Sequence, residues 1–284
     1  MNMVKYFFLL FVICFQSAIS FSQDTRKINS DKSHVFSFYT GYSKYIERDD
    51  AMSPFKYRGY SLPLEVTYRH NGAKCRQIFY VNFDKLKLLS SLPNYENAGL
   101  SHYVQNTNIQ IGYSYMYRLF RLAKFQTDIY FGGEINSLLN LRRHAYINNN
   151  EFLMLDQFSS IGLKALIEKR FSNDKQVATL NINIPILSYA LMKNTYNAYN
   201  GDKIDPLMNY SGNMLLYLAK NGDFVSLNRL VYFKTELSFI QFISNHIGVE
   251  CKLSLRYYQF TQYEDMNYSK NLQSQILIGI VGKL

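Results

Sequence analysis

Residues 125–142, FQTDIYFGGEINSLLNLR, decide the fold. The odd positions are mainly apolar, as at Phe125, Ile129 and Ile135, whereas the even positions are mainly polar or charged. Successive side chains on a β-strand point to opposite faces, so this alternation predicts a strand with one apolar and one polar face. The run is much longer than the about 5 to 6 residues that are usual in globular proteins. It therefore indicates a strand that crosses a membrane as part of a closed β-barrel.

The same alternation recurs along the chain and predicts an all-β fold, a transmembrane antiparallel up-and-down β-barrel of about ten strands. The predicted strands cover residues 35–45, 60–69, 76–88, 103–119, 125–142, 158–171, 177–191, 249–257 and 272–284, with an eighth strand that ends at 231–239. Pro63 cannot donate a backbone hydrogen bond, so we expect a bulge in the second strand.

The predicted connections alternate between long and short, which is typical of bacterial barrels with long extracellular loops and short periplasmic turns. Asn71-Gly72 favours a tight turn because these residues accept positive φ, whereas residues 46–59, 90–101 and 192–223 form longer connections. The even strand number then places both termini on the periplasmic side. Residues 214–219 are apolar, and we interpret them as an extracellular hairpin arm rather than a helix over the mouth or a further membrane strand.

The N-terminus divides the chain into three parts. Residues 1–22 have the pattern of a cleaved secretory signal peptide, with Lys5 ahead of an apolar core and small residues after it. Residues 23–33 are polar and read as a periplasmic linker, and residues 34–284 make up the barrel. The mature chain keeps Cys75 and Cys251, which fall on distant predicted strands, so we expect both thiols to be free.

The signal peptide, the alternating strands and the apolar C-terminal strand QSQILIGIVGKL together resemble Gram-negative outer-membrane β-barrel proteins, and the Asn-, Lys-, Ile- and Tyr-rich usage resembles that of Bacteroidota. The resemblance implies an integral outer-membrane location, contact with outer-membrane lipid and lipopolysaccharide, and insertion by the barrel-assembly machinery. Members of this class usually end in an aromatic residue, and Leu284 departs from that pattern. Ten strands also match the omptin proteases in number, but the chain shows none of their acidic and histidine motifs.

The inward-facing rows carry charges of both signs. The predicted lumen-lining residues are Glu65, Arg69, Asp128, Glu134, Lys164, Glu168, Lys234, Glu236, Glu250, Lys252 and Arg256. Ten strands enclose a narrow lumen, in which an unpaired charge is costly, so these groups must pair. Symmetric pairing about residues 148–150 sets Glu134 opposite Lys164, and Glu236 should lie near Lys252 or Arg256. We interpret this network as a salt-bridged plug; the alternative is a porin-like narrow path for a small solute or ion.

A second class of function is an outer-membrane hydrolase that acts on lipid A or protein at the extracellular lip. His102 and His144 fall near that lip, with Glu134, Asp156 and Ser159 on neighbouring segments, and such groups can activate a water or a serine. Nothing in the sequence sets their spacing, so no catalytic residue is assigned. No Cys/His spacing indicates a metal site and no Gly-rich loop indicates a phosphate site, so no cofactor is expected.

The chain is basic, with a formal net charge of +10, and its cations gather at the predicted periplasmic turns. These clusters are Arg69, Lys74 and Arg76; Arg118, Arg121 and Lys124; and Lys169, Arg170 and Lys175. We expect them to contact anionic lipid headgroups; nucleic acid is excluded by the location. The loop at 192–212 is rich in Asn and Tyr, which suits adaptable contacts with an extracellular ligand. The sequence thus predicts a structural, binding or small-solute passage protein.

Overall fold

The computed structural model describes residues 33–49, 53–90, 103–145, 151–171, 175–192, 222–261 and 268–284. These residues form twelve strands and one 3₁₀ turn: β1 Ser33–Asp49, β2 Ser53–Ser61, β3 Leu64–Asn71, β4 Cys75–Ser90, β5 Tyr103–Leu122, the turn Ala123–Phe125, β6 Thr127–Ala145, β7 Glu151–Arg170, β8 Gln176–Met192, β9 Asp223–Ser226, β10 Leu230–Phe242, β11 Ile247–Thr261 and β12 Tyr268–Lys283. The predicted signal peptide, nearly all of the predicted linker and the apolar segment 214–219 lie outside the described residues. No helix among the described residues is long and apolar enough to cross a bilayer.

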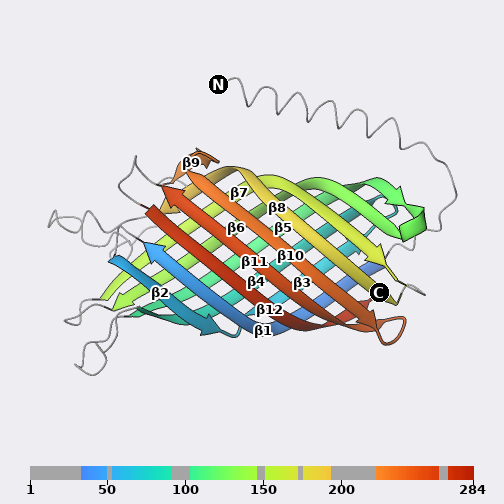
Figure 1. Cartoon of the computed structure of the whole chain (residues 1–284), viewed down its shortest axis with the longest axis horizontal. Coiled ribbons are helices and arrows are strands. Elements are labelled where there is room, and N and C mark those ends of the chain that lie inside the picture. Colours follow the sequence, from blue (N-terminus) through green and yellow to red (C-terminus); the bar gives the residue numbers. More distant parts are fainter. Residues whose placement is uncertain are drawn as a thin grey trace, which may run out of the picture.

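The strands close into a barrel (Figure 1). Consecutive strands pair antiparallel, except β2 with β3 and β9 with β10, and the sheet closes on itself because β12 pairs with β1 while β10 pairs with both β8 and β11. Strands β2 and β3 share the position between β1 and β4, and β9 and β10 share the position beside β8. The twelve described strands therefore occupy ten positions around the barrel, which confirms the predicted up-and-down architecture.

Two prolines mark the irregular places in this sheet. The break between β2 and β3 falls at Leu62 and Pro63, where the sequence predicts a bulge. A second irregularity lies between β7 and β8, where Gly162 pairs with Pro185 but Ile161 pairs with Leu187. Proline has no N–H to donate to the neighbouring strand, so the ladder is interrupted at both positions.

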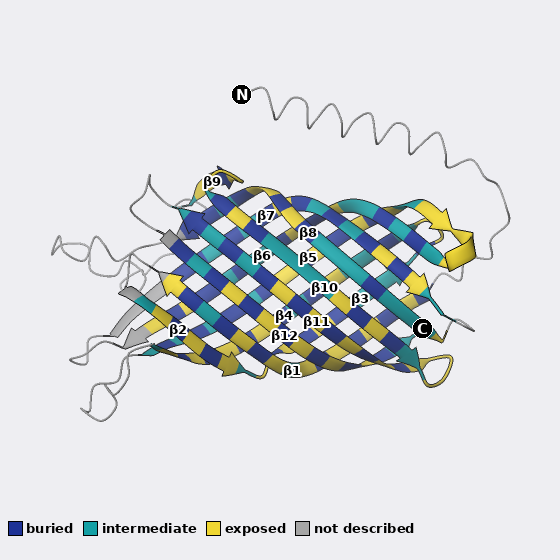
Figure 2. Cartoon of the chain, in the orientation of Figure 1, coloured by how far each residue is buried: buried dark blue, intermediate teal, exposed yellow. Residues whose placement is uncertain are grey.

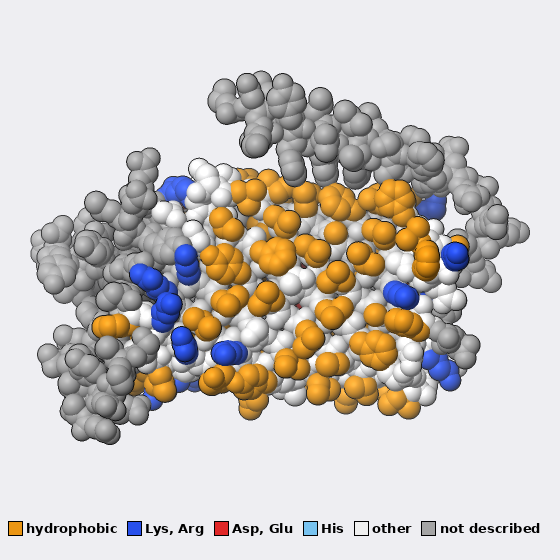
Figure 3. Space-filling model, in the orientation of Figure 1, with side chains coloured by type: hydrophobic (Ala, Val, Ile, Leu, Met, Phe, Trp, Pro, Cys, Tyr) orange, Lys and Arg blue, Asp and Glu red, His pale blue; other side chains and the backbone are white. Residues whose placement is uncertain are grey.

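Exposed and buried residues alternate along the strands of the barrel (Figure 2), and the exposed row is mainly apolar while the buried row is mainly polar. On β6, the outward Ile135 is 58% exposed while its neighbour Glu134 is 2% exposed. The same alternation runs along every long strand, and an apolar surface covers the middle of the barrel, with Lys and Arg gathered toward its two ends (Figure 3). A water-soluble protein buries its apolar row, so this inverted pattern is that of a barrel with lipid around it.

The predicted strand ends need correction. The decisive strand begins at Thr127 rather than Phe125, because Ala123–Phe125 forms a 3₁₀ turn and Gln126 adopts a left-handed conformation with φ 49°. Strand β1 continues to Asp49 and β2 begins at Ser53, so the predicted long connection at 46–59 reduces to residues 50–52. The inward row of β1 extends this far because Glu47 finds a partner across the lumen, as described below.

Two tyrosines lean over glycines inside the lumen and tie the register of neighbouring strands. Tyr80 on β4 pairs with Gly112 on β5, and Tyr39 on β1 pairs with Gly279 on β12. A Cβ atom at either glycine would clash with the ring of its paired tyrosine. A slip of one residue would move each ring to the lipid face and place a side chain under it, so these pairs specify the register.

A charged vestibule in one half of the barrel

A cavity of about 340 Å³ occupies the half of the barrel that carries the short turns. Its walls come from the inward side chains of β1, β3 to β8 and β10 to β12. It extends to the turn residues Gly72 and Ala73 and to Lys283 near the C-terminus, so its mouth lies at the short-turn end. We call this cavity the vestibule.

Glu134 and Lys164 form an ion pair at the inner end of the vestibule. Lys164 Nζ lies 2.6 Å from Glu134 Oε2, and the carboxylate also accepts hydrogen bonds from Tyr80 Oη at 3.1 Å and Asn183 Nδ2 at 2.5 Å. The predicted pair is present, but the predicted register is wrong by two residues, because Glu134 pairs with Gly162 and not with Lys164. The ion pair is therefore a diagonal contact between β6 and β7.

A second cluster centres on Lys252, whose Nζ lies 2.6 Å from Glu65 Oε1 and 3.5 Å from Glu236 Oε1. The sequence predicts the contact between Glu236 and Lys252, and the structure contains it. The ammonium also lies over the Tyr39 ring, 4.1 Å from its centroid. Beside it, Arg69 Nη2 donates to Glu250 Oε2 at 2.6 Å, and the same oxygen accepts from Tyr39 Oη at 2.6 Å.

Nearer the mouth of the vestibule, two carboxylates, Glu168 and Asp128, each have two arginines beside them. Arg76 donates to both oxygens of Glu168, at 3.2 and 3.1 Å, and Arg170 donates to Glu168 Oε1 from Nη2 at 3.0 Å and from Nε at 3.1 Å. Arg118 and Arg121 approach Asp128 Oδ1 at 3.7 and 3.8 Å. Each carboxylate can neutralise one unit of positive charge, so a positive excess remains near the mouth.

The charge of the whole vestibule is positive. Among the described lining residues, nine are cationic: Arg69, Arg76, Arg118, Arg121, Lys164, Arg170, Lys234, Lys252 and Lys283. Six are acidic: Glu65, Asp128, Glu134, Glu168, Glu236 and Glu250. The difference, nine minus six, is a formal charge of +3. The walls of a narrow cavity focus this field toward an incoming anion.

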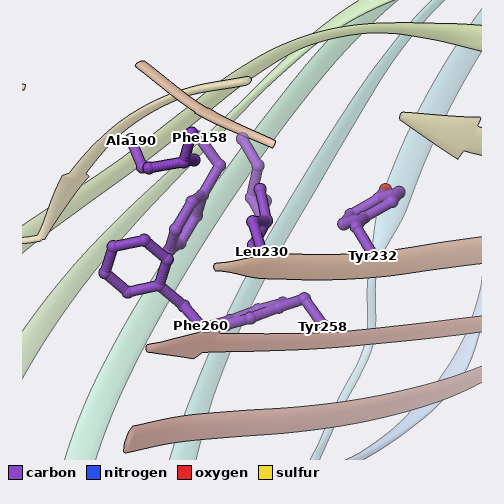
Figure 4. Close-up of a cluster of buried hydrophobic side chains, with 8 residues drawn as sticks. Phe158, Ala190, Leu230, Tyr232, Tyr258 and Phe260 are labelled. Atoms are coloured by element: carbon purple, nitrogen blue, oxygen red, sulfur yellow. The ribbon is translucent and has the colours of Figure 1, made fainter. Parts of the chain in front are cut away.

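The opposite half of the barrel, toward the longer connections, is filled by side chains. A cluster of buried residues there includes Phe158, Tyr258 and Phe260, whose rings pack against one another, with Leu230, Tyr232 and Ala190 beside them (Figure 4). A second cluster comprises Tyr45, Tyr57, Leu86, Leu88 and Val104. Large apolar side chains therefore occupy the axis of this half.

A buried ionic network accompanies these clusters. Arg142 has 1% of its side chain exposed, and its Nη1 and Nε lie 2.6 Å from Glu47 Oε1 and 2.7 Å from Asp156 Oδ2. Between this network and the vestibule, Gln110 donates to Tyr80 and Tyr232 and accepts from Arg256 Nη1 at 3.0 Å. These contacts join opposite walls across the middle of the barrel.

The structure turns every predicted lumen-lining residue toward the interior. Ten of these eleven line the vestibule, whereas Arg256 lies deeper, against Gln110. The interpretation of Arg76, Arg118, Arg121 and Arg170 as headgroup-contacting turn residues is wrong, because their side chains line the vestibule. The inward orientation of Arg76, Arg118 and Arg170 follows the alternation of their strands, whereas Arg121 turns inward because the register shifts between Arg118 and Phe120. The network around Arg142 was missed because Glu47 lay beyond the predicted end of β1.

The three hydrolase-hypothesis residues whose side chains the structure describes, Glu134, Asp156 and Ser159, do not converge. Asp156 points inward against Arg142, whereas Ser159 lies on the outward face and its hydroxyl contacts Ser137 Oγ at 2.9 Å. Glu134 is engaged with Lys164. His102 lies outside the described residues, as does the side chain of His144. No cluster of three or more His, Cys, Asp or Glu that could hold a metal ion occurs in the part of the chain that the structure describes.

Comparison with known proteins supports the fold. No protein-family model matches the sequence, and neither does any curated protein. Among solved structures, the outer-membrane protease OmpT from Escherichia coli is similar over 93% of this chain and 100% of its own, with a TM-score of 0.56 and 6% sequence identity. The translocator domain of the autotransporter NalP from Neisseria meningitidis covers 94% of this chain and 92% of its own, at a TM-score of 0.38 and 8% identity. At such identities the similarity to OmpT shows the barrel fold alone.

Proposed function

We propose that this chain is an integral outer-membrane protein that binds a small anionic solute in its vestibule and does not form an open pore. The observation that carries the proposal is the division of the lumen. One half holds a cavity with a formal charge of +3, and the other half is filled by aromatic side chains and the Arg142 network. A signal peptide over residues 1–22 and insertion by the barrel-assembly machinery fit this location. The residue usage supports a source in the Bacteroidota.

The vestibule faces the periplasm in this proposal. Bacterial barrels place their short turns and both termini on that side, and here His34 and Leu284 exchange backbone hydrogen bonds at the short-turn end. The ligand is a compact anion, because a cavity of about 340 Å³ is at the small end of ligand pockets. An anion with three charges would neutralise the excess, and one with two charges would reduce it to +1, without breaking any of the internal ion pairs.

The first test is conductance of the purified protein in planar bilayers. Narrow ten-stranded barrels sit well below the size at which wide aqueous channels appear, and the filled half blocks the axis, so we expect no discrete openings. Discrete, reproducible openings would overturn the closed-barrel proposal in favour of small-solute passage.

The second test is titration of the detergent-solubilised full chain with citrate. The variant Arg121→Gln/Lys283→Gln lowers the vestibule charge from +3 to +1 and leaves Asp128 with Arg118. We expect citrate binding by the native chain and at least tenfold weaker binding by this variant. The matched control, Lys124→Gln/Lys175→Gln, removes two exposed cations outside the vestibule and should leave the affinity unchanged. Equal weakening by both variants would refute a site in the vestibule.

A further inference from the structure

A dense group of cations lies on the outside of the barrel, near the end opposite the vestibule. Three neighbouring strands, β1, β2 and β4, contribute it, and we call it the outer basic patch. Its members are Lys44, Arg48, Lys56, Arg58, Lys85 and Lys87, all of them exposed. Figure 3 shows Lys and Arg side chains gathered at the end where β2 lies.

The strand register brings these cations together. Arg48 pairs with Lys56 across β1 and β2, and Tyr60 pairs with Lys44 on one side and with Lys87 on the other. Lys270 on β12, which pairs with Arg48, extends the group along the neighbouring strand. Strands are spaced by about 4.8 Å, so the three strands of the patch span about 10 Å around the barrel.

The charge of the patch is of one sign. In the outward rows 44–48, 56–60 and 85–89, six of the nine described positions are Lys or Arg, and the other three are Ile46, Tyr60 and Leu89. Among the described side chains of these stretches, the acidic Glu47 and Asp84 point into the lumen and are buried. Because the described outward positions of these three rows carry cations and no carboxylate, the rows attract anions from the surroundings of the barrel.

The surroundings at this height are lipid headgroups. A cation on the lipid face of a barrel is strongly unfavourable at the bilayer midplane and nearly neutral at the interface, so six cations on three adjacent strands mark the interface. Four residues separate Lys44 from Arg48, which at about 3.3 Å per residue and a tilt of about 40° gives a layer about 10 Å thick. The stacked pair Tyr42 and Tyr60, with ring centroids 5.3 Å apart, lies at the inner edge of this layer, as interfacial aromatic residues do.

We propose that the outer basic patch is a binding site for a lipid whose headgroup carries phosphate groups, in the leaflet that faces the long connections. Guanidinium and ammonium groups pair strongly with phosphate oxygens, and long side chains can lie along the barrel surface toward the headgroup. Lys87 already lies in this manner, with Nζ 4.2 Å from the centroid of the Tyr103 ring. The proposal rests on the membrane location proposed above and is independent of the vestibule.

The test uses native mass spectrometry of the full chain in detergent, with lipid A as the probe in diphosphorylated and dephosphorylated forms. The variant Lys56→Gln/Arg58→Gln/Lys85→Gln/Lys87→Gln removes four positive charges from exposed side chains. The control removes four exposed lysines at the other end of the barrel: Lys74→Gln/Lys124→Gln/Lys169→Gln/Lys175→Gln. Heat-modifiable gel mobility confirms that each variant is folded, and Lys85→Gln/Lys87→Gln serves as the milder variant if the fourfold change prevents folding.

We expect the native chain and the control to bind diphosphorylated lipid A equally, and the patch variant to bind it at least tenfold more weakly. The dephosphorylated lipid should bind as weakly to the native chain as the phosphorylated lipid binds to the variant. Equal binding of both lipids by the native chain, or full binding by the patch variant, would overturn the proposal. Competition by inorganic phosphate at concentrations that match the lipid would assign the patch to a soluble anion instead, and would overturn it as well. A vestibule that fails to bind citrate would leave these outcomes unaffected.

Discussion

Removal of both charges of the Glu134–Lys164 ion pair should destabilise the barrel by less than the sum of the losses from removing each charge alone. Nζ and Oε2 are 2.6 Å apart and both side chains are almost fully buried. At an effective dielectric constant of about 20, two unit charges at this separation attract by about 6 kcal/mol. Desolvation of the two groups offsets much of this attraction. When one partner is lost, the other stays buried without compensation, which costs about 3 to 5 kcal/mol.

The two single variants should lose different amounts of unfolding free energy. Lys164→Met leaves Glu134 with its hydrogen bonds from Tyr80 and Asn183, so the loss of unfolding free energy should be about 3 kcal/mol. Glu134→Gln leaves Lys164 beside the Ser114 hydroxyl at 3.3 Å, and the loss should be about 5 kcal/mol. In the double variant neither charge remains. Its loss should therefore be smaller than the sum of the single losses by about 2 to 3 kcal/mol, the coupling energy expected for a pair in direct contact.

Urea unfolding in detergent, followed by far-UV circular dichroism and by heat-modifiable gel mobility, measures these free energies. The chain contains no tryptophan, so tryptophan fluorescence offers no signal. Lys175→Met, at an exposed position, is the control for replacement of a lysine and should change the stability little. If the two single losses sum to the loss of the double variant within about 0.5 kcal/mol, the reasoning is refuted, because the effects of independent sites are additive to this extent.

Three further predictions concern the lipid face, the lumen and the orientation. Ile135→Arg places a charge on the lipid face and should lower the free energy of unfolding in lipid by about 2 to 4 kcal/mol, whereas Ile135→Leu should be nearly neutral. Gly112→Val should lower the melting temperature because its side chain meets the Tyr80 ring, and Tyr80→Ala should recover part of that loss. In intact cells a membrane-impermeant maleimide should label Cys75, beside a short turn, only after the outer membrane is permeabilised, and Cys251, which is exposed toward lipid, should stay protected; prompt labelling of Cys75 in intact cells would reverse the proposed orientation.

The face of the sheet on which each side chain lies could be predicted from the sequence, because it depends only on whether the residue is at an odd or an even position along its strand. Successive side chains alternate whatever their neighbours do, so the inward rows containing Glu65, Lys164 and Lys252 were assigned from the sequence alone. The ten strand positions of the barrel could be predicted from the same alternation. The irregularity at Pro63 could be predicted because proline has no N–H for the ladder. Strand ends were less accurate, since Gln126 turns the chain with a left-handed conformation that Gln rarely adopts.

The partners across the lumen could not be predicted, because they depend on how the strands are staggered around the closed barrel. Lys252 meets Glu65 although 187 residues separate them, and Arg69 meets Glu250 across 181. Contacts between adjacent strands, such as that of Lys252 with Glu236, can be predicted because the turn that joins the two strands sets their register. Contacts across the lumen depend on the sum of the register offsets of several strand pairs. An error of two residues in the register of one pair, as between β6 and β7, changes every contact predicted across that pair.

The division of the lumen follows from the size and charge of the inward side chains at each height. Toward the long connections the inward rows carry Leu138, Phe158 and Phe260, which are buried and belong to one apolar cluster. Toward the short turns the rows carry Lys, Arg and Glu, whose charged ends pair with one another and line the vestibule. A narrow barrel can be filled by apolar groups that touch or lined by charges that pair around the circumference. Among the described residues, this chain uses the first arrangement in one half and the second in the other, so the vestibule gives way to the buried clusters and the Arg142 network farther along the lumen.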